Sequence, residues 1–189
     1  MTDDEAVARM IDTLDELEIP YMLVGSLASG VYGVSGLTKD AVFVLELEGR
    51  RVREIATSLG EEFQLDPQVL FETVTGTTRY VIEVPSIPFR IDCFRLSPDD
   101  HDQQRFKRRK HGRLDQFQRM VYLPTVEDVI VTKLRWSLAA ARGKDADDIA
   151  HVIAVQGDAI DWDYVHRWCN EHGTRKRLDE IRASIPPID

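Results

Sequence analysis

The sequence has few of the features that mark secreted, zinc-binding or disulfide-rich proteins. Its 189 residues include only two cysteines, Cys93 and Cys169, and neither belongs to a Cys-x-x-Cys pair. The sequence therefore predicts no disulfide framework and no cysteine-based zinc site, and both thiols are expected to be reduced and structural. The five histidines form no His-Glu-x-x-His pattern, so they are expected at the surface or at helix ends rather than around a metal.

Long apolar runs and a basic N-terminal segment are also missing. No stretch approaches the roughly 20 apolar residues that cross a bilayer. The chain begins with acidic residues at positions 3–5, where a signal peptide would carry positive charge. We therefore expect a cytoplasmic protein that does not associate with membranes. Hydrophobic residues at 43% and charged residues at 30%, without low-complexity segments, favour a folded globule over disorder.

The chain has fewer basic than acidic residues. It contains 24 lysines and arginines and 33 aspartates and glutamates, which gives a net charge of -9. Broad, non-specific DNA binding is not expected, since it requires a basic surface that displaces counterions. The one basic cluster comprises Arg105, Lys107, Arg108, Arg109, Lys110 and Arg113. Two interpretations of this cluster stay open: a surface that binds RNA or a phosphorylated partner, and the solvated face of an exposed helix over 99–110.

Hydrophobic periodicity predicts an α+β (mixed α/β) fold, in which an α/β unit is followed by a C-terminal helical region. The boundary is expected near Pro124, which gives an α/β domain over 1–123 and a helical region over 124–189 packed on it. Strands are predicted at 21–24, 40–47, 79–84, 89–96 and 119–123. Helices are predicted at 4–17, 26–32, 49–59, 67–73, 99–110, 126–141, 144–155, 161–171 and 174–183, with a glycine-containing turn at 33–36.

A Gly-Ser pair at a predicted strand-helix junction provides groups suited to phosphate binding. The apolar run 21–24 ends in Gly25 and Ser26, and a helix is predicted to follow. Glycine lets the backbone approach a phosphate, a helix N-terminus offers unpaired N–H groups, and the serine hydroxyl adds a donor. The alternative is a plain turn without a ligand.

Two carboxylates in neighbouring predicted strands are suited to a divalent ion. Asp40 begins one strand and Asp92 lies inside another, and the two are expected to share one ion, since Mg²⁺ prefers oxygen ligands. The structural alternatives are that Asp40 caps the turn after Thr38, and that Asp92 pairs with Arg90 or Arg95.

The combination resembles the nucleotidyltransferase (polymerase-beta-like) superfamily, whose pattern is Gly-[Gly/Ser], a spacer, Asp-x-Asp and a third acid on a later strand. Gly25-Ser26, Asp40 and Asp92 match this pattern in order. The segments 21–29, 38–40, 124–134 and 155–158 are similar to an uncharacterised bacterial group of nucleotidyltransferase-like proteins, related more distantly to abortive-infection and toxin nucleotidyltransferases.

The resemblance implies the nucleotidyltransferase fold, a mixed sheet flanked by helices. It also implies metal-dependent transfer of a nucleotide from an NTP to a hydroxyl of an RNA, a protein or a small molecule. Asp40 and Asp92 would be the catalytic and metal-binding residues, with Mg²⁺ or Mn²⁺ as the cofactor. Gly25, Ser26 and Lys133 would bind the phosphates. For Lys133 a second interpretation has equal weight, namely a salt bridge to Asp148 within the run Lys-Asp-x-x-Asp-Ile at 144–149 that orients two helices.

One departure from the family pattern predicts weak or absent transfer. Val42 stands where the family usually has its second metal-binding aspartate, and a valine offers no oxygen to a cation. Glu46 shares the strand face but lies six residues, or about 20 Å, from Asp40 along the strand, too far to bind the same ion. With this degenerate motif the alternative function is a non-catalytic nucleotide-, RNA- or protein-binding member of a toxin-antitoxin or defence system, and a third possibility is a scaffold or regulatory subunit.

Overall fold

The structure is a computed structural model that describes residues 1–33, 38–140 and 143–186, and the chain divides into two compact units. The first unit comprises Met1–Leu27 and Leu37–Pro124, and the second comprises Ala28–Gly36 and Thr125–Asp189. Most of the predicted turn at 33–36, and residue 141 at the end of a predicted helix, lie outside the described residues.

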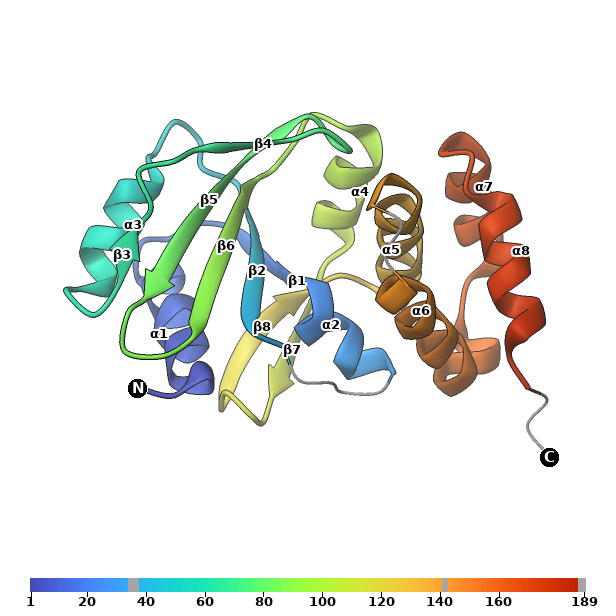
Figure 1. Cartoon of the computed structure of the whole chain (residues 1–189), viewed down its shortest axis with the longest axis horizontal. Coiled ribbons are helices and arrows are strands. Elements are labelled where there is room, and N and C mark those ends of the chain that lie inside the picture. The colour runs from blue at the N-terminus through green and yellow to red at the C-terminus, as the bar shows by residue number, and fades with distance from the viewer. Residues whose placement is uncertain (34–37, 141–142, 187–189) are drawn as a thin grey trace. The chain divides into compact units, whose positions relative to one another are not determined.

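A six-stranded mixed sheet forms the centre of the first unit, which confirms the predicted fold class (Figure 1). Its strands run in the order β1-β2-β6-β5-β3, and β4 also pairs with β5. β2 and β6 are parallel, whereas the other neighbouring strands are antiparallel. The strands are β1 (Tyr21–Val24), β2 (Asp40–Leu45), β3 (Gln64–Leu65), β4 (Leu70–Glu72), β5 (Thr77–Val84) and β6 (Phe89–Arg95).

One face of this sheet lies against α1 (Asp3–Glu16) and α3 (Val52–Leu59) (Figure 1). Alternating strand residues on this face are buried, because successive side chains of a strand point to opposite sides. Thr2 begins α1 with a capping box, in which its side chain accepts from the Glu5 amide while Glu5 accepts from the Thr2 amide. The buried residues of this face include Tyr21, Leu23, Ala41, Phe43, Leu45, Ile82, Ile91 and Cys93.

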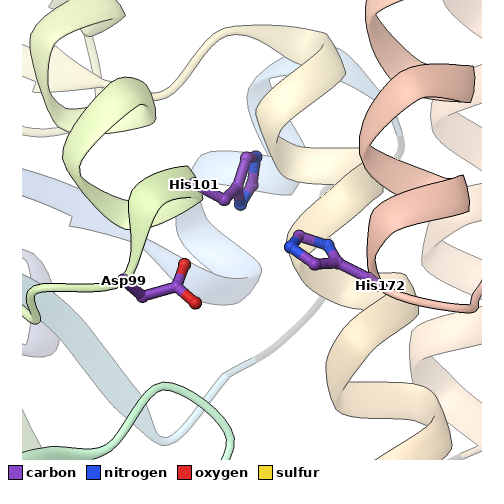
Figure 2. A group of neighbouring side chains, drawn as sticks. All are labelled: Asp99, His101 and His172. Atoms are coloured by element: carbon purple, nitrogen blue, oxygen red, sulfur yellow. The ribbon is translucent and has the colours of Figure 1, made fainter.

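The opposite face of the sheet is covered at one end by α4 (Asp100–Arg108), whose Phe106 packs with Met22, Val24 and Val44. The side chain of Asp99 caps this helix by accepting from the Asp102 amide, and His101 lies buried in its first turn (Figure 2). The helix predicted over 99–110 is present at 100–108, but the expectation that it is exposed is wrong for one side, where His101, Asp102, Arg105 and Phe106 are buried. One side of this highly charged helix is buried, and the spacing of its residues in the sequence did not indicate that side.

A separate hairpin of β7 (Lys110–Leu114) and β8 (Arg119–Leu123) follows α4. The ring of Tyr122 on β8 stacks on His111 with centroids 4.2 Å apart, and the Arg109 guanidinium lies 4.9 Å from the same ring. β7 was not predicted from the sequence, because apolar and polar residues do not alternate in its Lys-His-Gly-Arg segment. The helix predicted at 67–73 is also wrong, since this segment contains β4, which pairs with β5.

The second unit consists of helices around its own hydrophobic core. They are α5 (Val126–Ala140), α6 (Gly143–Gln156), α7 (Trp162–Glu171) and α8 (Arg175–Ser184), with a 3-10 turn at Gly157–Ala159. His172, the C-cap residue of α7, follows the last residue of that helix (Figure 2). The helix α2 (Gly25–Tyr32) begins in the first unit and ends in the second. The core includes Val126, Ile130, Leu134, Ile149, Val152, Val165, Trp168, Cys169, Leu178 and Ile181.

Among the described residues, none of the helices has the length and apolar character needed to span a membrane.

Candidate functional site

The register of three strands brings the predicted site residues to one face of the sheet. Val42 on β2 pairs with Asp92 on the parallel strand β6 and with Val24 on the antiparallel strand β1. Paired residues of neighbouring strands share a face, and so do residues two apart in one strand, which adds Asp40 to this set. Asp40, Val42 and Asp92 therefore lie on the face opposite α1 and α3.

Asp92 is buried and lies beside two arginines. Its side chain is 4% exposed; Arg79 Nη1 lies 3.6 Å from its Oδ2, and Arg90 Nε lies 3.5 Å from its Oδ1. No donor in the described part of the chain makes a hydrogen bond with Oδ1. Burial raises the pKa of the Asp92 carboxyl, as the nearby Asp40 also does, whereas Arg79 and Arg90 act in the opposite direction.

Asp40 is the more accessible carboxylate, and it shares Arg90 with Asp92. Arg90 Nη2 lies 3.8 Å from Asp40 Oδ2, so one guanidinium bridges the two aspartates. The Thr38 hydroxyl donates to Asp40 Oδ1 at 2.7 Å. Both structural contacts expected from the sequence, Thr38 with Asp40 and Arg90 with Asp92, are thus present. Arg95, the other expected partner of Asp92, is exposed and lies on the opposite face of β6.

Gly25 follows β1 directly and lies against Val42. Its φ of +72° is in the left-handed region, which residues other than glycine rarely occupy. A Cβ at position 25 would lie 3.2 Å from Val42 Cγ2. The turn that carries Gly25 and Ser26 therefore lies next to Val42.

We expect the Gly25→Ala variant to be less stable than Gly76→Ala, although both glycines have φ near +70°. A Cβ at Gly76 would meet no atom within 4 Å, so this variant measures the backbone cost alone, about 1–2 kcal/mol. Gly25→Ala adds crowding against Val42, which brings the expected loss to about 2–4 kcal/mol. Urea unfolding of both variants checks this expectation. Equal losses would mean that Val42 yields to the added methyl group at little cost.

The donor set on this face does not fit a pair of divalent ions. Such ions need several anionic oxygens, but Val42 supplies none. The charges of Asp40 and Asp92 are offset by those of Arg79 and Arg90. Two arginines thus offset the two aspartates, whereas the carboxylates of a two-ion site would be offset by the ions.

Lys133 lies in the second unit, on α5, and forms ion pairs with two acids of α6. Its Nζ lies 2.7 Å from Asp148 Oδ2 and 3.4 Å from Asp145 Oδ1. The predicted salt bridge of Lys133 to Asp148 is present. The role of Lys133 in phosphate binding stays a prediction. Asp145 was not foreseen as a partner, although its i,i+3 spacing from Asp148 places both acids on one side of the helix.

Arg79 is the residue of this face that sequence reasoning missed. It belongs to β5, and its approach to Asp92 depends on the pairing of Val81 with Asp92 across β5 and β6. The available signal was an arginine within a strand rich in Val and Ile. Because charged residues in such strands are usually paired, it pointed to a nearby acid.

The basic cluster does not form one free surface. Arg105 is buried and its Nε lies 2.7 Å from Asp102 Oδ1. Arg109 lies over the Phe106 ring at 4.1 Å, and its Nη1 donates to the Phe106 carbonyl. Lys107 and Lys110 are the exposed lysines of the cluster. RNA or a phosphorylated partner at this cluster stays a prediction.

No family model and no curated protein matches the chain. Solved structures nevertheless share its fold. The solution structure of the antibiotic-resistance factor ANT(2'')-Ia matches with a TM-score of 0.63 and 13% identity, over 95% of this chain and 97% of that one. The crystal structure of ANT(2")-Ia in complex with adenylyl-2"-tobramycin gives 0.60 and 14%, over 93% and 99%.

An antigenic nucleotidyltransferase-like protein from Paracoccidioides brasiliensis matches with a TM-score of 0.53 and 16% identity, over 95% of this chain and 91% of that one. These matches span nearly the whole chain. The chain therefore has the nucleotidyltransferase fold.

Proposed function

We propose that this protein binds a nucleoside triphosphate on the sheet face that carries Asp40 and Asp92, and that its nucleotide-transfer activity is weak or absent. The observation that carries the proposal is the pairing of both remaining carboxylates with arginines around Val42. Where two metal ions would need anionic ligands, each of these carboxylates already lies beside an arginine. Gly25, with its φ of +72°, supports the proposal as well, because a glycine turn of this kind can let a phosphate approach the backbone.

The ancestral chemistry would use Mg²⁺ or Mn²⁺ held by Asp40 and Asp92, and Arg90 competes with such an ion for both carboxylates. The acceptor class is proposed as a hydroxyl on a small molecule, an RNA or a protein. The complex of ANT(2")-Ia with adenylyl-2"-tobramycin supports the small-molecule case for a protein of this fold. A toxin-antitoxin or defence role remains the non-catalytic alternative, in which nucleotide binding alone is used.

Incubation with each α-labelled NTP, Mg²⁺ or Mn²⁺, and pools of RNA, protein or aminoglycoside acceptors tests the loss of transfer. We expect no labelling above that of Asp40→Ala in any pool. Robust labelling that Asp40→Ala abolishes would overturn the proposal of weak transfer. Equilibrium binding of unlabelled NTPs, measured by calorimetry, tests the retained site. The absence of heat for all four NTPs, with and without metal, would contradict nucleotide binding.

Val42→Asp is expected to strengthen the binding of a metal-NTP complex, because it places a third carboxylate beside Asp92 on the same face. The ratio of the Kd for metal-free NTP to the Kd for Mg²⁺-NTP should then be about tenfold or more higher in the variant than in the wild type. Val42→Asn is the matched control, since it has nearly the same shape as aspartate without the charge. Equal metal dependence in the two variants would show that this face no longer accommodates a metal-nucleotide complex.

A further inference from the structure

We infer that the guanidinium groups of Arg79 and Arg90 replace divalent ions as the ligands of the polyphosphate, so that this protein binds nucleotides without a metal. The inference rests on the proposed function and deepens it, because it names the groups that hold the ligand and the form of the nucleotide that binds. The ligand is a metal-free nucleoside triphosphate.

The first argument is the position of Arg90. Its guanidinium lies between Asp40 and Asp92, at 3.8 Å and 3.5 Å from their oxygens, which is the position of a cation shared by two carboxylates. An ion entering this position would have to displace Arg90. Arg79 provides a second positive group, 3.6 Å from the other oxygen of Asp92.

The second argument is that the carboxylates do not saturate these arginines. Charge-assisted N–H···O bonds measure about 2.7–2.9 Å, whereas the separations here are those of looser ion pairs. A guanidinium carries five N–H donors in a planar fork that matches phosphate oxygens. The side chain of Arg90 is 50% exposed and that of Arg79 is 28% exposed, so a ligand can reach both.

The third argument is the division of roles between the two aspartates. Asp92 is buried and lies beside both arginines, so it holds the two guanidinium groups near one another on this face. Asp40 is more accessible and contacts only Arg90 of this pair. An accessible carboxylate next to a metal-free phosphate repels it, whereas the same carboxylate would be required if a metal held the phosphate. Removing the charge of Asp40 should therefore strengthen the binding of a metal-free NTP, whereas it should weaken the binding of an NTP that a metal holds.

The test is titration of ATP, GTP, CTP and UTP into the full chain by calorimetry, in EDTA and in Mg²⁺. We expect the Kd of the preferred NTP in EDTA to be equal to, or lower than, that in Mg²⁺. Asp40→Asn should tighten binding in EDTA by about fivefold. Arg79→Gln and Arg90→Gln should each weaken it by about tenfold or more.

Two further variants keep the test decisive. Arg79→Lys and Arg90→Lys retain the charge that compensates Asp92 but lose the planar fork, so they should fold and still bind more weakly than the wild type. Arg95→Gln removes an exposed arginine from the opposite face of the same strand, and it should leave the Kd unchanged.

The outcomes separate the inference from the proposed function. If no NTP binds in either buffer, the proposed function fails. If binding requires Mg²⁺ and Asp40→Asn weakens it, the proposed function stands and the inference is overturned. Binding in EDTA that the Arg79 and Arg90 variants leave intact would also overturn the inference, because other groups would then hold the phosphates.

Discussion

The Lys133→Ala variant is expected to lose about 3–5 kcal/mol of unfolding free energy, the cost of breaking a buried ion pair from one side. Lys133 is 10% exposed, and it is paired with Asp145 and Asp148 on the neighbouring helix. Removal of the ammonium leaves two largely buried carboxylates without their cation. Since single domains are stable by only about 5–15 kcal/mol, this change should bring the second unit close to unfolding at ambient temperature. Urea denaturation followed by far-UV circular dichroism measures the loss.

Two control variants show whether the loss in Lys133→Ala comes from the buried ion pair. Lys176→Ala removes an exposed lysine of the same unit, 4.0 Å from Glu180, and should change stability by no more than about 1 kcal/mol. Combining Lys133→Met with Asp145→Asn and Asp148→Asn removes the stranded charges, so stability should largely return. If this triple variant is stable and yet binds NTP more weakly than the wild type, the predicted contact of Lys133 with phosphate gains support. A Lys133→Ala loss no larger than that of Lys176→Ala would contradict the structural role.

The Arg105→Ala variant is expected to destabilise the first unit by a similar amount, about 3–5 kcal/mol. The Arg105 side chain is only 7% exposed, and Asp102, its ion-pair partner, is buried as well. The second oxygen of Asp102 accepts from the Ser97 hydroxyl at 2.8 Å, so the carboxylate cannot leave for solvent without breaking that contact. Loss of Arg105 therefore leaves a buried negative charge.

Arg113→Ala is the matched control for Arg105→Ala, because it also breaks an arginine-aspartate pair in the same unit. Arg113 Nε lies 3.0 Å from Asp115 Oδ1, but both side chains are mostly exposed. An exposed pair contributes about 0–1 kcal/mol, so this variant should unfold almost like the wild type. Chemical denaturation of the two variants side by side checks the contrast. Similar losses for both would mean that burial does not decide the value of these pairs.

The elements with strong local patterns were predicted well. The alternation of apolar residues along β2 indicated that Asp40 and Val42 share the face opposite Ala41 and Phe43, and the strand pairing confirms it. The four C-terminal helices were predicted within a few residues of their bounds, because their apolar residues recur at helical spacing.

The missed elements depend on pairing rather than on local sequence. β3, β4 and β7 have two to five residues each, and their backbones are held by hydrogen bonds to β5 or β8. The same limit applies to the candidate site. Asp40 and Asp92 were foreseen because they fit a motif, whereas the contact of Arg79 with Asp92 follows from a cross-strand register that no local pattern encodes.

The two cysteines give each unit its own indicator of opening. Cys93 is fully buried in the central strand β6 of the first unit, and Cys169 is fully buried in the helical core of the second. Burial raises the pKa of both thiols, which disfavours the reactive thiolate. An alkylating reagent can therefore reach either sulfur only during a transient exposure of the surrounding core. The modification rates of the two cysteines, resolved by peptide mass spectrometry, would report the local breathing of the sheet and of the helices separately, without an introduced probe.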